Sequence, residues 1–566
     1  MVPAQVKEFA AMCREGGPDR FYGSPGSRSA PLLLSLLRTA GLEVCLLGDE
    51  RSAAYRALGY ALGSAKPAGL FCTSGTAVLN FGPAIAEAFY QKIPLLLATA
   101  DRPPELIDQQ EGQAVRQHGI FQAHTVYSAG VPSHESSEVA RIHSRRIFNE
   151  AFQACSGPVR GPVHLNFPIR EPFYPDSEED FSVTRPLRRQ ISRPEFRLPR
   201  EELSSLIEIW NRSARRLLLA GQMPPDSGIS NACKALTEYA ECPVLGDMLH
   251  NLEMVKGCVL YPDLLQEGFL SSGGSRADVI ISIGNGFLSK SVLKYLKENP
   301  PAEHWHIAED GFPADAAGSI TRVIQASPEW LITRLAEASC FSEKQNRQLT
   351  QSWYQNWLAA AARVKEVRTS ISASWQWSDL HATDGLLKAI PTGSVLFLAS
   401  SMPVRYAAWL YEAHPAAEIF SNRGTSGIDG CLSTAMGIAD ARPQQTVFAL
   451  LGDMAFLYDR NALWTNKIPP NLKIMVLNNG GGNIFRILPA SSGLPEMEDY
   501  FEMQQNQTAK GTCTDAGIPR FECRSAEEYP GAMQNWLAEK SCALLEVFTD
   551  KAQNHRVVQE FREAFR

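Results

Sequence analysis

TVFALLGD at residues 446–453 and LKIMVLNN at residues 472–479 are two apolar stretches of strand length. The segment between them has a helical pattern at residues 455–465. A strand, a helix and a second strand in this order form a right-handed crossover, in which the two strands are parallel. Both strands therefore end at the same edge of one sheet, where open α/β sheets bind their ligands.

Metal-binding chemistry follows directly after these two strand ends. Asp453 closes the first, and the turn Asn479-Gly480-Gly481 closes the second. One carboxylate, one amide oxygen and the exposed carbonyl of Gly481 form half of an oxygen shell typical of Mg²⁺. A cation with so few protein ligands takes the rest from water and a phosphorylated ligand, so the pattern indicates a diphosphate cofactor. Gly-Asp and Asn-Gly are also common turn formers, and for an isolated pair that simpler interpretation is favoured.

The composition is that of a large enzyme acting on small molecules. At 566 residues the chain is too long for a single core and predicts about three domains. A net charge of -7 and a pI near 6.0 argue against nucleic acid or an anionic membrane as the main partner. Twelve cysteines without a CxxC pair, and a start without a signal-peptide layout, predict a cytoplasmic protein. No apolar run approaches the roughly 20 residues of a membrane span.

Three α/β blocks follow one another, so we predict an α/β fold of three doubly wound parallel-sheet domains in series. The predicted domains are residues 1–180, 200–365 and 366–566, and residues 181–199 form a linker rich in proline and charge. A helix over 351–367 leads into the last domain. The other predicted strands end at Tyr22, Leu47, Cys72, Thr99, Ser401 and Ser421 or cover 217–220, 243–246, 279–283, 304–307 and 321–324.

Polar clusters follow the strands of the first block. They are GSPGSRS at 23–29, GDER at 48–51, TSGT at 73–76 and ADRPP at 100–104, and parallel strands would gather them on one rim. Glu50 in the second cluster has two interpretations. Asp49 and Glu50 can simply cap and complement the helix that follows. Alternatively, Glu50 is the carboxylate that thiamin diphosphate requires beside its aminopyrimidine ring, the second requirement of this cofactor after a Mg²⁺ diphosphate site.

Several motifs together resemble, in order, the SEPHCHC synthases of the menaquinone pathway, a family of thiamin diphosphate enzymes. They are SPGSRSAPL at 24–32, DERSAA at 49–54, TSGTA at 73–77, TADRPPEL at 99–106, GPVHLN at 161–166, SMPVR at 401–405, SNRGTSGIDG at 421–430, the Gly452-Asp453 pair and NNGGGNIF at 478–485. These matches cover the first and third blocks. The central block is similar only in layout, with Lys290 as the one position carried over.

The resemblance implies a pyrimidine-binding, a central and a diphosphate-binding domain, in that order. It also implies a transferase that decarboxylates 2-oxoglutarate and adds the succinyl carbanion equivalent to isochorismate, with release of CO₂. Thiamin diphosphate and Mg²⁺, or Mn²⁺ as an alternative metal, are the implied cofactors. The implied assembly is a homodimer or a dimer of dimers, with active sites at the subunit interface.

The resemblance also assigns roles to individual residues. Glu50 is the catalytic residue, and the metal ligands are Asp453, Asn479 and Gly481. The cofactor-binding set is Glu50, Thr76, Ser401, Thr425, Ser426, Ile428, Asp453, Met454, Ala455, Asn479 and Ile484. The substrate-binding set is Ser27, Arg28, Arg102, Gln113, Lys290, Ser401, Arg405, Ile484 and Phe485. The arginines suit this role because guanidinium groups bind carboxylates in a bidentate manner. Taken alone, an arginine is more often part of a surface salt bridge. An apolar residue taken alone is more often part of the core.

Three positions depart from the expected family pattern. Met454 replaces the third glycine of a Gly-Asp-Gly motif, Gly112 replaces an amide side chain before Gln113, and Ser291 replaces a basic residue after Lys290. The last two concern the acceptor substrate.

Two alternatives therefore remain open. The first is another thiamin diphosphate-dependent 2-oxo acid decarboxylase or carboligase; a flavin-binding acetolactate-type enzyme is disfavoured, because the central block has no dinucleotide fingerprint. The second is a non-catalytic binding protein on the same fold, which we expect to lack Glu50.

Overall fold

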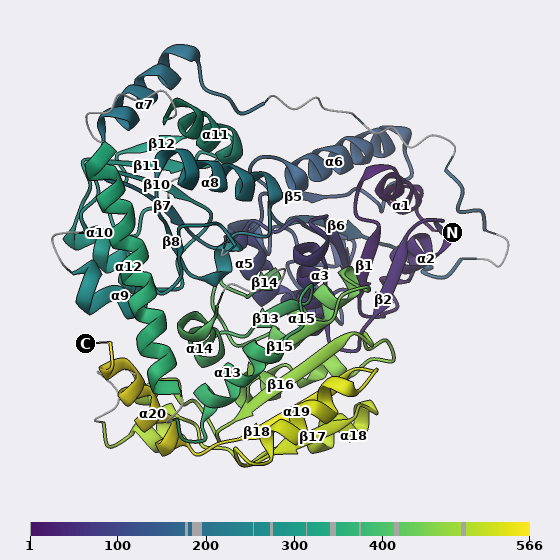
Figure 1. Ribbon diagram of the computed structural model, residues 1–566. Coiled ribbons are helices and arrows are strands. Elements are labelled where there is room, and N and C mark those ends of the chain that lie inside the picture. The colour runs from purple at the N-terminus through teal and green to yellow at the C-terminus, as the bar shows by residue number, and fades with distance from the viewer. Residues whose placement is uncertain are drawn as a thin grey trace.

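The computed structural model describes residues 2–175, 179–183, 189, 195–252, 254–271, 275–312, 314–339, 347–372, 375–412, 418–487 and 494–565. Most of the predicted linker lies outside these residues. The chain forms three six-stranded sheets in series, and every strand pairing is parallel (Figure 1). The predicted fold class is therefore confirmed. No helix within these ranges combines the length and apolar character needed to cross a membrane.

The first sheet has the strand order β2-β1-β3-β4-β6-β5. Its strands are β1 (Arg20–Gly23), β2 (Glu43–Leu46), β3 (Ala68–Cys72), β4 (Leu95–Asp101), β5 (Tyr127–Gly130) and β6 (Val163–Pro168). The helices of this domain are α1 (Ala4–Gly16), α2 (Ala30–Arg38), α3 (Glu50–Ser64), α4 (Thr76–Leu79), α5 (Gly82–Gln91) and α6 (Glu138–Ser156), with η1 (Pro104–Leu106) and η2 (Gln122–His124).

The central sheet has a different order, β12-β11-β10-β7-β8-β9. Its strands are β7 (Arg216–Ala220), β8 (Val244–Gly246), β9 (Cys258–Val259), β10 (Val279–Ile283), β11 (Glu303–Ile307) and β12 (Arg322–Ile324). Its helical segments are α7 (Arg200–Arg212), α8 (Ser227–Ala240), η3 (Met248–His250), α9 (Pro262–Leu265), η4 (Gln266–Leu270), α10 (Lys290–Glu298), α11 (Pro328–Ser339) and α12 (Arg347–Ser372).

The third sheet has the order β14-β13-β15-β16-β18-β17, which repeats the order of the first. Its strands are β13 (Val395–Leu398), β14 (Glu418–Phe420), β15 (Val447–Gly452), β16 (Leu472–Asn478), β17 (Arg520–Cys523) and β18 (Ala543–Phe548). Its helical segments are α13 (Asp379–Ala389), α14 (Met402–Leu410), α15 (Cys431–Ala441), α16 (Asp453–Tyr458), η7 (Arg460–Leu463), α17 (Ile484–Ile487), η8 (Met497–Phe501), α18 (Lys510–Ala516), α19 (Tyr529–Ala538) and α20 (Lys551–Glu563).

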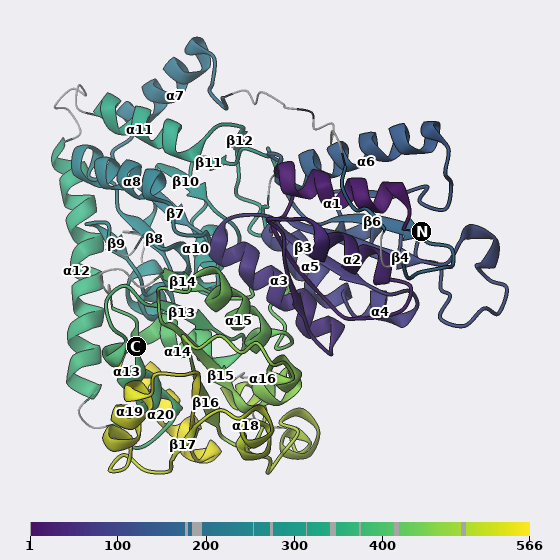
Figure 2. The ribbon, with the colours of Figure 1, turned by 90° about the vertical axis from the view of Figure 1, so that its right-hand side faces the viewer.

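Helix α12 joins the central and third domains. It has 26 residues and runs from one domain to the other along a single side of the molecule (Figures 1 and 2). Trp353 and Trp357 anchor it in the core shared by these domains. The predicted boundary at residues 365 and 366 falls inside this continuous helix, and the boundary stays a prediction.

The inner strands form because their residues are apolar on both faces. All residues of β3, β4, β7, β10 and β16 are buried, as expected for parallel strands covered by helices on both sides. The sequence analysis did not predict β5, β9 and β17, which lie at the edges of the three sheets. β5 and β17 have mixed burial, and β9 has only two residues, so their periodicity is weak. It also did not single out the apolar strand β18.

The first and third domains pack through helices α3 and α15. A Cβ atom on Gly59 would lie 2.0 Å from the carbonyl oxygen of Thr434, and a Cβ atom on Gly437 would lie 1.9 Å from that of Arg56. The two contacts are reciprocal, because each glycine of one helix faces the backbone of the other. Only glycine permits so close an approach at these two points. Helices α3 and α15 therefore pack with their backbones in direct contact at these two points.

Candidate active site

The ends of β15 and β16 meet as predicted. Asp453 begins α16 directly after β15, and Asn479 directly follows β16. The backbone N–H groups of Gly480 and Gly481 donate to Asp453 Oδ2 at 3.0 and 2.9 Å. Both glycines have positive φ angles, +80° and +148°, which favour glycine. The turn is therefore held against Asp453 by its own backbone.

Two oxygen atoms of this corner remain available for a cation. Asp453 Oδ1 accepts a hydrogen bond from the N–H of Met454 at 2.7 Å and retains a lone pair. Asn479 Oδ1 is buried and has no hydrogen-bond partner among the described residues. A buried polar atom without a partner is costly, and a metal ion would satisfy it. The donor set of a carboxylate and an amide oxygen fits Mg²⁺.

The electrostatics of the corner also favour a cation. Asp453 is 3% exposed, and burial raises its pKa to about 6. The amide of Gln505, 2.6 Å from Oδ2, acts in the opposite direction, while the nearby Asp379 carboxylate raises the pKa further. Two buried carboxylates in close proximity would be stabilised in their ionised form by a dication.

The loop between β14 and α15 carries the residues predicted to contact the cofactor. Thr425 donates to the Glu87 carboxylate through its N–H at 2.7 Å and its hydroxyl at 2.6 Å. Ser426 has a φ of +63°, and Ile428 packs against the core of the third domain. Glu87 belongs to α5 of the first domain and is 1% exposed. The sequence analysis missed Glu87, because only the folded chain brings it to residues more than 300 positions away.

Both interpretations of the Asp49-Glu50 pair agree with the structure. Asp49 is the N-cap of α3 and accepts hydrogen bonds from the N–H groups of Arg51 at 2.8 Å and Ser52 at 3.3 Å. Glu50 is the first residue of the helix and is half-buried. Its carboxylate has no hydrogen bond or ion pair within the part of the chain that the structure describes. Capping is therefore done by Asp49 alone, and Glu50 is available for a ligand.

Two arginines lie together on the rim of the first sheet. Arg28 and Arg102 are only 5% and 9% exposed. Burial and the charge of Arg102 both lower the pKa of Arg28. Arg28 lies 4.5 Å from the ring centre of Phe173, and its Nε has no partner among the described residues. Glu111 lies 3.8 Å from Arg102, but the two guanidinium groups still repel each other, so this rim fits a carboxylate ligand.

The neighbouring polar residues of this rim are on the surface. Ser27, Thr76 and Gln113 are exposed, and Gln113 lies against Gly75. The carbonyl of Gly112 accepts a hydrogen bond from Arg102 Nε at 3.1 Å. A Cβ atom on Gly112 would meet no atom within 4 Å, so nothing steric in the structure explains glycine there.

A second pair of arginines lies between the central and third domains. Arg405 donates to the carbonyl of Ser401 at 2.5 Å, and burial lowers its pKa while Asp263 raises it. Burial and the charge of Arg405 also lower the pKa of Arg423, while Asp247 raises it. The sequence analysis quoted Arg423 within the motif at 421–430 but gave it no role. Its position three residues after a strand end could have identified it.

Lys290 and Ser291 begin helix α10 on the central-domain side. Lys290 is exposed, and its side chain forms no hydrogen bond or ion pair with the residues that the structure describes. The hydroxyl of Ser291 donates to Asp263 Oδ1 at 2.9 Å, and Trp409 Nε1 contacts Asp263 Oδ2 at 3.4 Å. The serine that departs from the family pattern therefore helps to hold Asp263.

The predicted apolar residues follow the two metal-binding strand ends. Ile484 and Phe485 begin α17 and are half-buried. Ile484 packs against a hydrophobic core cluster, and the Phe485 ring lies 5.8 Å from that of Phe501. Met454 and Ala455 lie in the first turn of α16. These positions agree with the predicted lining of a ligand site, but packing alone accounts for the observed contacts.

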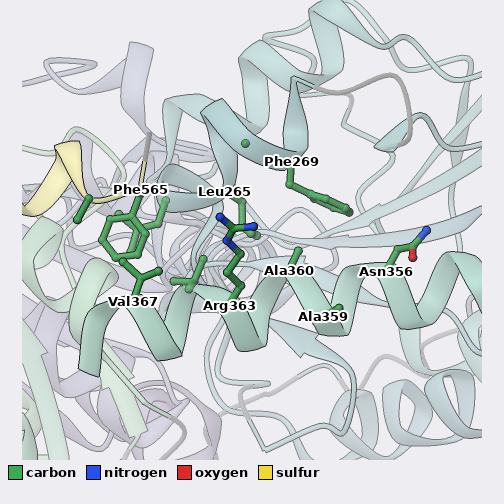
Figure 3. A pocket seen from close by; sticks show the side chains of 12 residues that line it. Leu265, Phe269, Asn356, Ala359, Ala360, Arg363, Val367 and Phe565 are labelled. Atoms are coloured by element: carbon green, nitrogen blue, oxygen red, sulfur yellow. The ribbon is translucent and has the colours of Figure 1, made fainter. Parts of the chain in front are cut away.

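A separate cavity of about 570 Å³ lies between α12, η4 and the end of the chain. Arg363 extends from α12 into this cavity toward Leu265, with Phe269 and Phe565 on its other sides (Figure 3). None of its lining residues belongs to the predicted site. We therefore place the candidate active site at the strand ends and not in this cavity.

Comparison with known proteins agrees with this fold. Family models for the N-terminal thiamine pyrophosphate binding domain, the middle domain and the C-terminal thiamine pyrophosphate binding domain match residues 6–124, 201–398 and 401–547. The protein is thus a thiamine pyrophosphate enzyme by class.

Full-length relatives give the particular family. The chain is 34% identical to the 2-succinyl-5-enolpyruvyl-6-hydroxy-3-cyclohexene-1-carboxylate synthase of Cytophaga hutchinsonii, over 95% of both chains. It is 34% identical to that of Porphyromonas gingivalis, over 95% of this chain and 93% of the relative. Its identity to that of Bacteroides thetaiotaomicron is 33%, over 98% of both chains. The chain belongs to this family of synthases, and the resemblance in its motifs is confirmed.

Proposed function

We propose that this chain forms 2-succinyl-5-enolpyruvyl-6-hydroxy-3-cyclohexene-1-carboxylate from 2-oxoglutarate and isochorismate, with release of CO₂, in menaquinone biosynthesis. The observation that carries this proposal is the corner formed by Asp453 and the unpartnered Asn479 Oδ1, in a chain similar to these synthases over its whole length. The corner supplies the diphosphate-metal site that the cofactor needs.

The residues present fit thiamin diphosphate and Mg²⁺. Asp453, Asn479 and the carbonyl of Gly481 would hold the metal, and Ile428 would support the aminopyrimidine from below. Glu50 would hold a proton at the N1′ atom of this ring, because its carboxylate has no competing partner among the described residues. When bound, the cofactor supplies the thiazolium ring that accepts electrons as CO₂ leaves.

The two arginine pairs divide the substrates between them. Arg405 and Arg423 would bind the carboxylates of 2-oxoglutarate, since both are partly buried and lie near Ser401. Arg28 and Arg102 would bind isochorismate, with Ser27 and Gln113 adding hydrogen bonds. Ionic pairs in a partly dehydrated pocket orient both reactants, so the bond forms between fixed partners.

The assembly and the location belong to the same proposal. We infer a homodimer in the cytoplasm, in which Glu50 of one chain and Asp453 of its partner meet at each site. None of the eleven cysteines that the structure describes forms a disulfide, which is consistent with a reducing compartment.

Product analysis tests the proposed function. Purified protein with Mg²⁺, thiamin diphosphate, 2-oxoglutarate and isochorismate should yield the carboxylated cyclohexene product, detected by its mass. The Glu50→Ala variant is the negative control. If 2-oxoglutarate is decarboxylated but no isochorismate adduct forms, the chain is a different thiamin diphosphate-dependent decarboxylase or carboligase.

A further inference from the structure

We propose that Asp379 is a positioning residue of the metal site, which turns the side-chain amide of Asn479 so that Oδ1 faces the cation. This inference rests on the proposed function, because it presupposes that a cation binds between Asp453 and Asn479. Asp379 is 1% exposed, and it lies outside the sequence motifs described above. It is the first residue of α13, whose N-cap is Ser378.

A chain of hydrogen bonds fixes the direction of every group around Asp379. The N–H of Asp379 can only donate, and it donates to Asn554 Oδ1 at 2.8 Å. The amide nitrogen of Asn554 must then be the donor to Thr549 Oγ1, at 3.0 Å. The Thr549 hydroxyl in turn donates to Asp379 Oδ1 at 2.6 Å. Asp379 Oδ1 is therefore an acceptor, which leaves Oδ2 to face Asn479.

The second oxygen of Asp379 determines the orientation of Asn479. Asn479 Nδ2 donates to Asp379 Oδ2 at 2.7 Å. A carboxylate oxygen accepts hydrogen bonds but does not donate them. If the Asn479 amide flipped, this hydrogen bond would be lost, and Asn479 Oδ1 would face Asp379 Oδ2, which is unfavourable because both atoms are acceptors. The opposite end of the amide, Oδ1, is the buried atom that has no partner among the described residues. The network thus holds an oxygen ligand in place before the metal arrives.

The negative charge of Asp379 has a second effect at the same site. Asp379 Oδ2 lies 2.7 Å from the amide nitrogen of Asn479, so its charge acts on the same cation as the charge of Asp453. A site with two buried carboxylates attracts a divalent cation more strongly than a site with one. Groups that orient metal ligands typically change metal affinity by about 10- to 100-fold when they are removed.

Mn²⁺ binding tests this role without relying on turnover. Mn²⁺ affinity is measured by electron paramagnetic resonance in the presence of thiamin diphosphate, for wild-type protein, Asn479→Ala, Asp379→Ala and Asp379→Asn. We expect about 10- to 100-fold weaker binding for Asp379→Ala. Asp379→Asn can still accept from Asn479 through its own Oδ1, so it should fold, keep the amide orientation and bind Mn²⁺ with intermediate affinity.

A matched control and a kinetic comparison separate positioning from a general structural defect. Glu8→Gln removes a buried carboxylate that is 2% exposed in the first domain, and it should leave Mn²⁺ affinity unchanged. In Asp379→Asn the activation constant for Mg²⁺ should rise, while kcat at saturating Mg²⁺ stays near the wild-type value.

The outcomes distinguish this inference from the proposed function. If the wild type shows no Mn²⁺ binding that depends on thiamin diphosphate, the proposed metal site and the positioning role are both overturned. If Asn479→Ala loses Mn²⁺ while both Asp379 variants bind it like the wild type, only the positioning role is overturned. If Asp379→Ala fails to fold, Asp379→Leu decides the question, because leucine is close to aspartate in volume and removes the acceptor that holds the Asn479 amide.

Discussion

Asp49 caps helix α3, so the neighbouring Glu50 carboxylate remains available to bind a ligand. Asp49 accepts the exposed N–H groups at the start of α3, so the helix does not need Glu50 as a cap. The carboxylate that remains is half-buried and has no partner within the described ranges. A group in this situation can hold a proton on a ligand without first breaking an internal contact.

The Glu50→Gln variant tests this proton-holding role. Glutamine keeps the size and hydrogen bonding but removes the negative charge that favours a protonated aminopyrimidine. We expect thiamin diphosphate binding to persist, while exchange of its C2 proton in D₂O slows by orders of magnitude. Asp49→Asn is the matched control, since asparagine also caps helices well. Normal exchange in Glu50→Gln would refute the assignment.

The two arginine pairs predict that single substitutions affect different substrates. Arg405→Ala should raise the KM for 2-oxoglutarate, and Arg28→Ala should raise the KM for isochorismate. Each removes a charge-assisted hydrogen bond, so an increase of about ten- to a hundredfold is expected. Steady-state kinetics with each substrate varied in turn measures both effects. The two-pocket arrangement fails if both variants weaken the same substrate only.

At the level of elements, the contact between α3 and α15 depends on two glycines. Gly437→Ala would place a Cβ atom 1.9 Å from the carbonyl oxygen of Arg56, so the helices must move apart. We expect a loss of about 1–3 kcal/mol or more in the free energy of unfolding, measured by chemical denaturation. Gly531→Ala in α19 is the control, because its Cβ would meet no atom within 4 Å. That change should stabilise by about 0.5–1 kcal/mol.

A buried carboxylate in the same interface predicts a dependence on pH. Asp459 accepts hydrogen bonds from Ser433, and burial raises its pKa to about 7. The positive charge of Arg51 lowers this pKa, and the negative charge of Asp49 raises it. The folded state therefore holds this proton more tightly than the unfolded state does. Stability should fall as pH rises from about 4 to about 7, by up to ~1.4 kcal/mol per pH unit.

Asp459→Asn should remove most of this pH dependence. Its amide oxygen can accept from the Ser433 N–H, and its NH₂ group can face the hydroxyls of Ser433 and Ser52, which rotate to accept. Thermal unfolding at pH 5, 6, 7 and 8 compares the variant with the wild type. The difference in Tm should shift in favour of the variant between pH 5 and pH 7 and level off by pH 8, and parallel curves would contradict the role of Asp459.

The sequence predicted those elements whose cause is local. The inner strands are continuous apolar runs, and the site residues at their ends belong to motifs that can be recognised along the chain. The edge strands β5, β9 and β17 were missed because such short strands lack a clear apolar pattern. Glu87 and Asp379 were missed for another reason. Their roles depend on contacts between distant segments, which no local pattern contains.

At the scale of the whole molecule, the origin of each site can be tested by mixing subunits. Glu50→Ala and Asp453→Ala chains are each expected to be inactive. If each site takes Glu50 from one chain and Asp453 from its partner, every hybrid dimer contains one intact site. Random exchange makes half of the dimers hybrid, so activity should recover to about a quarter of the wild-type value. Subunit exchange is verified by mass spectrometry of differently tagged chains.

The same experiment identifies the alternative arrangement. The first and third domains of one chain are already in contact, through Arg56 and Asp440 at 2.7 Å and through Glu87 and Thr425. If verified hybrids recover no activity, both residues of a site come from one chain. The dimer would then be unnecessary for completing the site.

The reciprocal glycine contact shows which positions of the first and third domains are equivalent. The first and third sheets share one strand order, and the sequence offset that carries Gly59 onto Gly437 also carries Arg56 onto Thr434. Helices α3 and α15 therefore correspond position by position at this contact. The same offset carries Glu50 onto Ile428. The residue proposed to hold a proton on the cofactor and the residue proposed to support its ring thus occupy equivalent positions in the two domains.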